Sequence, residues 1–155
     1  AVLNRMNVRC GMRDGVFEVK PSQPKAARRI TTGLWPSFPS DLISLVTVLA
    51  TQAQDRTLVH DWMYELRLFA LEQLSGMGAD LFLADAHRII VSGPTRLRGG
   101  RLLDSRDIRS GMSLIAAGLA AEGQTRVQPL EIVERGYSQL VERLQGLGAK
   151  VAKIE

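Results

Sequence analysis

An internal repeat of about 70 residues limits the folds open to this chain more than any other feature of its sequence. Leu71–Ala84 (LEQLSGMGADLFLA) matches Val141–Ile154 (VERLQGLGAKVAKI) at an offset of 70. Upstream, DLISLVTVLATQAQDRTLV, which starts at Asp41, aligns with RSGMSLIAAGLAAEGQTRV, which starts at Arg109, at an offset of 68. Two matched blocks at nearly the same offset argue against a chance likeness between two Leu- and Gly-rich helix ends.

The matched blocks predict the same elements in each copy. The downstream pair indicates the end of an amphipathic helix, a glycine C-cap and then a strand. The upstream pair indicates an apolar helix that runs through a polar turn into a strand. The unit is therefore helix, strand, helix, strand, and this alternation predicts layered α/β (α+β) architecture.

The first residues resemble the end of an earlier copy. VLNRMNVRCGMRDGVFEVK indicates a helix end and two strands joined by a turn at Asp14-Gly15. We therefore expect one partial domain over residues 1–155, in which residues 1–30 are the tail of a preceding unit, 31–100 a second unit and 101–155 a third. On this interpretation the chain is a fragment or remnant of something longer.

Composition excludes several classes of protein. A chain of 155 residues is long enough to bury a core. The single cysteine, Cys10, rules out an internal disulfide, favours a reducing cytoplasm and is expected to be buried. No apolar run approaches the roughly 20 residues that cross a bilayer, so no membrane partner is expected. The net charge of +4 indicates an anionic partner without identifying it.

Asp41 is the first candidate for chemistry. It follows the apolar, proline-flanked segment Trp35–Ser40 and precedes the apolar helix predicted over Leu42–Thr51. A carboxylate in a first helical turn is favoured by the helix dipole, so Ser40 and Asp41 have a plain interpretation as an N-cap pair. The functional alternative is a positioned carboxylate that orients or deprotonates a hydroxyl group. Both interpretations stay open at this point.

Arginines form the second set of candidates. Asp107-Ile108-Arg109 lies near the start of the helix predicted over Met112–Ala121, where Arg109 can present two N–H groups to a phosphate or carboxylate while Asp107 holds it. Arg67 and Arg135 stand at equivalent junctions of the repeat. One carboxylate and two or three arginines at equivalent corners would suit a small dianionic ligand beside a hydroxyl, although a surface salt bridge is the simpler explanation of each arginine alone.

No metal site or cofactor is expected. His60 and His87 stand apart, with no cysteine or carboxylate at metal-ligand spacing. Gly99-Gly100 lacks the Lys-Ser/Thr of a phosphate-binding P-loop.

Taken together, these blocks resemble the UDP-N-acetylglucosamine enolpyruvyl transferase family. The resemblance covers nearly the whole chain, and the ordered set is far more specific than any one block. It is carried by Trp35-Pro36-Ser37-Phe38-Pro39-Ser40-Asp41, Tyr64-Glu65-Leu66-Arg67, Asp107-Ile108-Arg109, Glu134-Arg135-Gly136-Tyr137 and Leu144-Gln145-Gly146-Leu147-Gly148-Ala149.

The resemblance implies a fold of two similar domains, each built from three βαβαββ units in an inside-out α/β barrel, with substrates bound between the domains. It also implies transfer of enolpyruvate from phosphoenolpyruvate to the 3′-hydroxyl of UDP-N-acetylglucosamine, with the missing amino-terminal domain as a partner. The residues implied as catalytic are Asp41 and Asp107, and those implied as substrate-binding are Asp41, Met63, Arg67, Arg109 and Arg135.

The sequence departs from the family pattern at three positions. Ser40 stands where the family has threonine, Leu66 where it has asparagine, and Glu134 where it has aspartate. The family's loop cysteine belongs to the other domain, and Cys10 is not that residue. Two alternatives to an enzyme stay open: a non-catalytic ligand-binding or structural module that retains the repeat fold, and, more weakly, a nucleic-acid binder that uses the basic stretch Arg96–Arg109.

Overall fold

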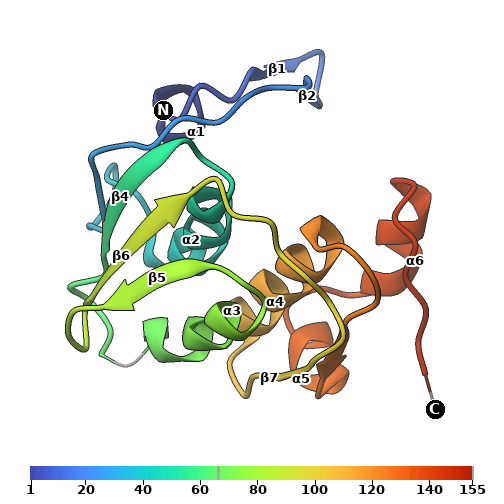
Figure 1. The fold of residues 1–155 in the computed structure, drawn as a ribbon. Coiled ribbons are helices and arrows are strands. Elements are labelled where there is room, and N and C mark those ends of the chain that lie inside the picture. The colour runs from blue at the N-terminus through green and yellow to red at the C-terminus, as the bar shows by residue number, and fades with distance from the viewer. Residues whose placement is uncertain (66, 155) are drawn as a thin grey trace.

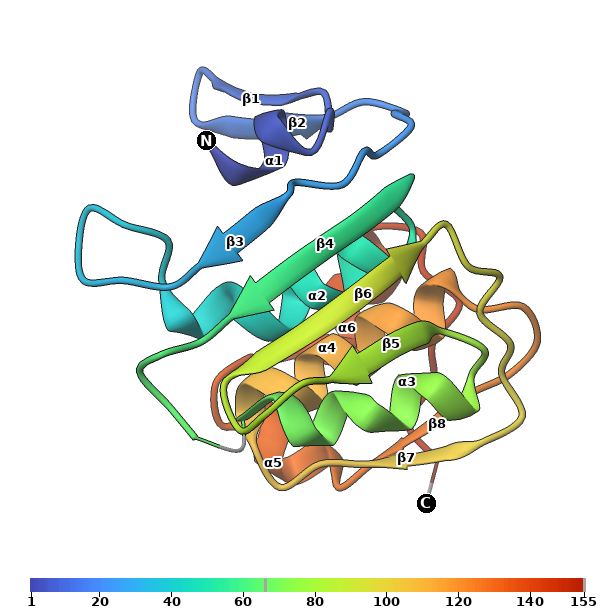
Figure 2. The same cartoon turned by 60° about the vertical axis from the view of Figure 1, so that its left-hand side comes forward.

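The computed structural model describes residues 1–65 and 67–154, and its centre is a four-stranded sheet (Figure 2). The strand order is β3-β4-β6-β5. β3 pairs with β4 in parallel, whereas β6 pairs antiparallel with both β4 and β5. The strands are β3 (Arg29–Thr31), β4 (Asp55–His60), β5 (Asp80–Leu83) and β6 (Arg88–Gly93).

Helices alternate with these strands along the chain, so residues 29–93 form one complete βαβαββ set. The first strand is followed by a 3₁₀ turn, η1 (Ser40–Leu42), and by α2 (Ile43–Thr51). β4 is followed by η2 (Arg67–Glu72) and α3 (Gln73–Gly76). The predicted fold class, α/β with βαβαββ units, is confirmed. The predicted division at residues 30/31 and 100/101 stays a prediction.

A second set of elements begins in the same order. β7 (Leu102–Asp104) pairs in parallel with β8 (Arg126–Gln128), and α4 (Ile108–Ala120) lies between them in sequence. α5 (Leu130–Glu134) and α6 (Leu140–Gly146) follow. The strand predicted after the second repeat block is not formed, because residues 149–154 are irregular. β5 is a strand because β6 pairs with it, and no described residue offers residues 149–154 such a partner.

The core lies between the sheet and the two long helices. α2 and α4 pack against each other behind the sheet (Figure 2). Alternation along β6 points Ile89 and Val91 into this core and leaves Arg88 and Ile90 on the outer face. From the helices, Ile43 and Leu114 are fully buried.

The three short helices α1 (Val2–Arg5), α3 and α6 end in the same backbone motif, which is the clearest structural trace of the repeat. In each, the second residue after the C-cap donates its N–H to a carbonyl five residues earlier, at 2.9–3.0 Å. The residue before that donor has positive φ, which glycine and asparagine tolerate. The glycine caps Gly78 and Gly148 are therefore confirmed, and Asn7 forms a third that the sequence comparison did not single out.

The predicted amino-terminal hairpin is also present. β1 (Cys10–Arg13) pairs with β2 (Val16–Val19), and Asp14 and Gly15 form the turn with φ of 50° and 78°. The hairpin stands apart from the sheet (Figure 1). Its pairs Met12–Phe17 and Cys10–Val19 make one apolar face, on which Met12 is 72% exposed. Cys10 is only partly buried, contrary to the prediction: its Sγ contacts Asn4 of α1 at 3.7 Å, but its neighbours Met12, Phe17 and Val19 are more than half exposed.

Gly93, the last residue of β6, packs against the main chain at the end of α2, and alanine there should destabilise the fold. A Cβ atom would collide with the Ala53 carbonyl oxygen and lie 2.8 Å from the carbonyl oxygens of Ala50 and Thr51. Main-chain atoms cannot rotate away, so we expect Gly93→Ala to lower the free energy of unfolding by about 3 kcal/mol, the upper part of the range for overpacking. Urea unfolding measures this value. Gly11→Ala is the control, since its Cβ would meet nothing within 4 Å, and equal midpoints for the two variants would contradict the packing.

Candidate functional site

Three of the predicted residues meet where α2 and α4 begin. Asp41 lies in η1, Asp107 precedes α4 and Arg109 is in its first turn. The Nε of Arg109 donates to Oδ1 of Asp41 at 2.7 Å, and its Nη1 lies 3.6 Å from Oδ1 of Asp107. Asp41 and Arg109 occupy equivalent positions of the repeat, so the ion pair joins the two units at their matching corners.

Asp107 is held in place because it caps the helix that follows it. α4 begins at Ile108, four residues before the predicted start, and Asp107 is its N-cap. Its Oδ2 accepts a hydrogen bond from the Ser110 N–H at 2.8 Å, which leaves Oδ1 facing Arg109. Asp107 therefore lies within ion-pair distance of Arg109, and its role in holding that residue stays a prediction.

Both members of the Asp41–Arg109 pair remain open to solvent. Their side chains are 64% and 38% exposed. The hydrogen bond to Asp41 raises the pKa of Arg109, with burial opposing and the Asp107 charge assisting, so the guanidinium stays charged at any working pH. Only one of its five N–H groups is used by Asp41. The pair can therefore meet an anionic ligand without a large rearrangement.

The N-cap interpretation of Ser40 and Asp41 is wrong. The N-cap residues of η1 and α2 are Pro39 and Leu42, and neither helix has a side-chain cap. Asp41 instead points to Arg109, whereas Ser40 is buried and donates to Asp61 at 2.7 Å. The structure thus removes the capping role, and the positioned carboxylate stays a prediction.

Arg67 lies inside the protein and not on its surface. Its side chain is 7% exposed, its guanidinium carbon is 3.9 Å from the centre of the Tyr64 ring, and its Nη1 donates to Ser40 Oγ. The same nitrogen is 3.6 Å from Oδ2 of Asp61. The sequence comparison missed Asp61, because its repeat equivalent at an offset of 68 is Pro129 and nothing nearby marks it as special.

The remaining predicted residues surround this region without joining the cluster. Met63 is half-buried, and its N–H donates to Oδ1 of Asp61 at 3.2 Å. Arg135 is exposed at the end of α5, and its side chain has no hydrogen bond or ion pair with another described residue. Arg135 nevertheless lies near the start of α4, because a Cβ on the next residue, Gly136, would be 2.7 Å from the Ile108 side chain. Leu66 lies outside the described residues.

An open pocket lies between η2 and the start of α4. Its lining includes Arg67, Arg106, Asp107 and Ser110. Two predicted site residues, Arg67 and Asp107, thus border a hollow that is lined by two arginines and two carboxylates, the second carboxylate being Asp104.

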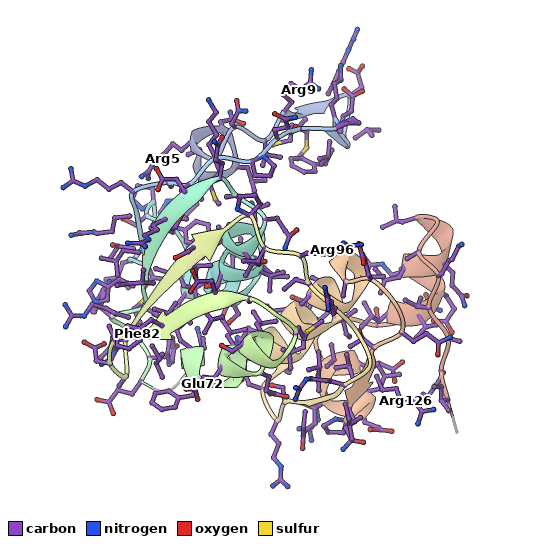
Figure 3. The ribbon with its side chains drawn as sticks, viewed as in Figure 1. Arg5, Arg9, Glu72, Phe82, Arg96 and Arg126 are labelled. Atoms are coloured by element: carbon purple, nitrogen blue, oxygen red, sulfur yellow. The ribbon has the colours of Figure 1, made fainter. Side chains whose placement is uncertain are left out.

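The basic stretch Arg96–Arg109 does not form one surface. Arg96 pairs with Glu122, just beyond the end of α4, at 2.6 Å, whereas Arg109 pairs with Asp41 at the other end of that helix. The guanidinium of Arg101 packs over Gly76. Figure 3 shows Arg96 well apart from Arg126, the basic residue at the start of β8. This dispersal removes the continuous basic face that the nucleic-acid alternative requires.

Two features are absent from the described residues. No helix among them is both long and apolar enough to span a membrane. Within the same ranges, no three His, Cys, Asp or Glu side chains are grouped so as to hold a metal ion.

Comparisons with known proteins agree with one another. The profile of the EPSP synthase family (3-phosphoshikimate 1-carboxyvinyltransferase) matches residues 1–144. The chain is 43% identical over 127 residues to the UDP-N-acetylglucosamine 1-carboxyvinyltransferase of Borreliella burgdorferi, covering 82% of this chain and 30% of that protein. The enzyme of the same name from Treponema pallidum is 44% identical over 125 residues, 81% of this chain and 29% of its own length.

A solved structure extends the likeness to three dimensions. The enolpyruvyl transferase NikO from Streptomyces tendae superimposes with a TM-score of 0.84 at 28% identity, covering 96% of this chain and 34% of that one. The chain thus spans about a third of the length of the proteins that it matches.

Proposed function

Because the chain belongs to the EPSP synthase family of enolpyruvyl transferases, we propose that it supplies one wall of the active site of a UDP-N-acetylglucosamine 1-carboxyvinyltransferase. The reaction moves enolpyruvate from phosphoenolpyruvate to the sugar 3′-hydroxyl and releases phosphate. The observation that supports this most strongly is the Asp41–Arg109–Asp107 cluster at the matching corners of two repeat units. In the cell the reaction would begin peptidoglycan synthesis in the cytoplasm.

In this proposal Asp41 is the acid/base residue. The 3′-hydroxyl gives up its proton and its oxygen adds to C2 of phosphoenolpyruvate while C3 takes up a proton. Loss of that proton from C3 then restores the double bond as the C2–O bond to phosphate breaks, and the hydroxyl proton leaves with the phosphate. A carboxylate placed beside the hydroxyl can accept the proton. The exposure of Asp41 and its lack of a capping role support this use. Asp107 takes part through its contact with Arg109.

The arginines are proposed to hold the anionic donor. Arg109 and Arg135 would contact phosphoenolpyruvate with paired N–H groups, which match the geometry of phosphate and carboxylate. Arg109 contacts Asp41 at 2.7 Å. A phosphate that takes over this guanidinium would compete with Asp41 for it, which would free the carboxylate for the hydroxyl.

Met63 and Arg67 are proposed for the acceptor side. Met63 is half-buried in the segment that follows β4, where its side chain can meet the UDP-sugar. Arg67 has little exposed surface, so its contribution would pass largely through the Tyr64 ring on which it packs and through Ser40.

We propose the amino-terminal domain of the complete transferase as the partner of this chain. Relatives such as that of Borreliella burgdorferi extend over about three times the matched length. In the register that aligns Asn7 with Gly78, the apolar face of the β1–β2 hairpin, which includes Met12 and Phe17, corresponds to the face of β5–β6 on which Ile89 and Val91 are buried. An uncovered two-stranded hairpin is marginally stable, so this face would be covered by the rest of the transferase.

The proposal is tested by phosphate release from phosphoenolpyruvate by the complete protein. We expect release only when UDP-N-acetylglucosamine is present. A non-catalytic module would bind the nucleotide sugar in calorimetry and release no phosphate, which would decide for that alternative.

Arg135→Lys tests the donor site. A point ammonium cannot reproduce a two-pronged contact, and loss of a charge-assisted hydrogen bond costs about 1.5–3 kcal/mol. We therefore expect kcat/KM for phosphoenolpyruvate to fall about 10- to 100-fold, with KM for the acceptor little changed. Arg143→Lys, the same substitution at an exposed position of α6, is the control. If both variants have wild-type kcat/KM, Arg135 does not contact the donor.

A further inference from the structure

Asp61 is a fully buried carboxylate to which the proposed mechanism gives no role. It is the first residue after β4, and its exposure is 0%. A buried ionised group persists only where partners satisfy it. The residues that contact the Asp61 carboxylate therefore identify the segments that it holds in place.

Donors from three other segments meet on its two oxygens. Oδ1 accepts from Thr32 Oγ1 at 2.9 Å and from the Met63 N–H at 3.2 Å. Oδ2 accepts from Ser40 Oγ at 2.7 Å and lies 3.6 Å from Arg67 Nη1. The carboxylate thus joins the end of β3, the start of η1, its own following loop and the start of η2.

The backbone of Asp61 is fixed as firmly as its side chain. Its N–H donates to the His87 carbonyl at 2.9 Å, and Nδ1 of His87 contacts the Asp61 carbonyl at 2.7 Å. Since a carbonyl only accepts, that ring nitrogen carries the proton. Nearby, Trp62 Nε1 donates to the Thr32 carbonyl at 2.6 Å. Asp61 is therefore a rigid anchor from which neighbouring segments are held.

We propose that Asp61 is the positioning residue of the acceptor side of the site. Through Ser40 it fixes the main chain next to Asp41, and through the Met63 N–H and Arg67 it fixes the segment proposed to meet the UDP-sugar. This inference rests on the proposed function for its catalytic consequence. The anchoring of the two segments stands on the hydrogen bonds alone.

Asp61 needs its negative charge, and not only its size, to anchor these segments. The groups that contact its oxygens are all donors, and an ionised carboxylate is an acceptor only. In Asp61→Asn the amide oxygen can keep Met63, which leaves the NH₂ group facing Ser40 and the Arg67 guanidinium. Arg67 then loses its charged partner while remaining buried. The substitution therefore loosens the Ser40 and Arg67 side of the network first.

The experiment compares Asp61→Asn and Ser40→Ala with wild type in the complete protein. Ser40→Ala cuts the link between Asp61 and the segment of Asp41 but leaves the Asp61–Arg67 pair, so it remains informative if Asp61→Asn does not fold. A misplacement of about 1 Å can cost about 10²-fold in rate. We expect kcat per folded molecule to fall 10- to 100-fold in each variant, with KM for phosphoenolpyruvate within twofold of wild type. Glu122→Gln, which also removes a carboxylate paired with an arginine, should leave both constants unchanged.

Hydrogen exchange supplies a readout that does not depend on turnover. In both variants we expect amides of residues 40–42 and 61–65 to exchange at least tenfold faster, with β5 and β6 unchanged. If wild type shows no turnover, the proposed function is wrong, and the exchange rates alone decide whether Asp61 anchors these segments. Unaltered exchange there, or wild-type kcat in Ser40→Ala, would overturn the proposal.

Discussion

Replacing Asp41 by asparagine is expected to lower kcat of the complete transferase by about 10²- to 10⁴-fold, or roughly 3–5 kcal/mol of barrier, and to leave the fold intact. Asparagine keeps the shape of the side chain and can still accept a hydrogen bond from Arg109, but it cannot take the proton of a hydroxyl. Stability should hardly change, because exposed ion pairs contribute at most about 1 kcal/mol and Asp41 caps neither η1 nor α2.

Steady-state phosphate release measured beside thermal unfolding separates these effects. Asp80→Asn, a substitution of the same kind at an exposed position of β5, is the matched control and should behave as wild type. Near-normal turnover in the Asp41 variant would end the catalytic assignment and leave Asp41 as a surface partner of Arg109.

The 155-residue chain by itself is expected to fold cooperatively and to release no phosphate. Its sheet and helices enclose a core around residues such as Ile43 and Leu114, whereas Asp41 and Arg109 lie on an open surface. Enolpyruvyl transfer requires a site that excludes water, and one wall cannot close over its substrates. Circular dichroism with urea unfolding tests the first expectation, and a phosphate assay with both substrates tests the second.

The same assay on the complete protein is the control for that experiment. Measurable acceptor-dependent release by the chain alone would contradict the view that this chain forms only one wall. A chain that does not fold would contradict the assignment of an independent core to these residues.

Local sequence signals predicted local structure well. A glycine after an amphipathic helix end predicted the caps at Gly78 and Gly148, and Asp14-Gly15 between two short strands predicted a hairpin turn. In each case the backbone conformation is set by one or two residues, so the sequence carries the information. The early start of α4 at Ile108 was missed, since Asp107 was interpreted as a partner of Arg109 and its capping of the helix was overlooked.

Features that depend on distant contacts were harder to predict. The strand expected over residues 149–154 has the right residues but no paired neighbour among those described. Asp61 gave no signal because its partners Thr32 and Ser40 lie 29 and 21 residues away. The repeat aligns Arg67 with Arg135, but only the fold shows that the Arg67 guanidinium turns inward to Asp61.

The repeat nevertheless predicted the arrangement that matters most for the site. Asp41 and Arg109 align at an offset of 68, and the structure brings these two residues into contact. Equivalent helix starts in two packed units lie side by side, so equivalent residues can meet there. The family resemblance added the chemical roles, which composition and spacing alone do not provide.

Product identity in a competition assay is the most direct test of the central claim, that the chain forms one wall of a UDP-N-acetylglucosamine 1-carboxyvinyltransferase. The complete protein would be given phosphoenolpyruvate with equal amounts of UDP-N-acetylglucosamine and shikimate 3-phosphate, the acceptor indicated by the name of the family profile. Mass spectrometry would then identify which acceptor carries the enolpyruvyl group. We expect enolpyruvyl-UDP-N-acetylglucosamine as the product, and this product should be lost in Asp41→Asn. Transfer to shikimate 3-phosphate alone, or to neither acceptor, would contradict the account.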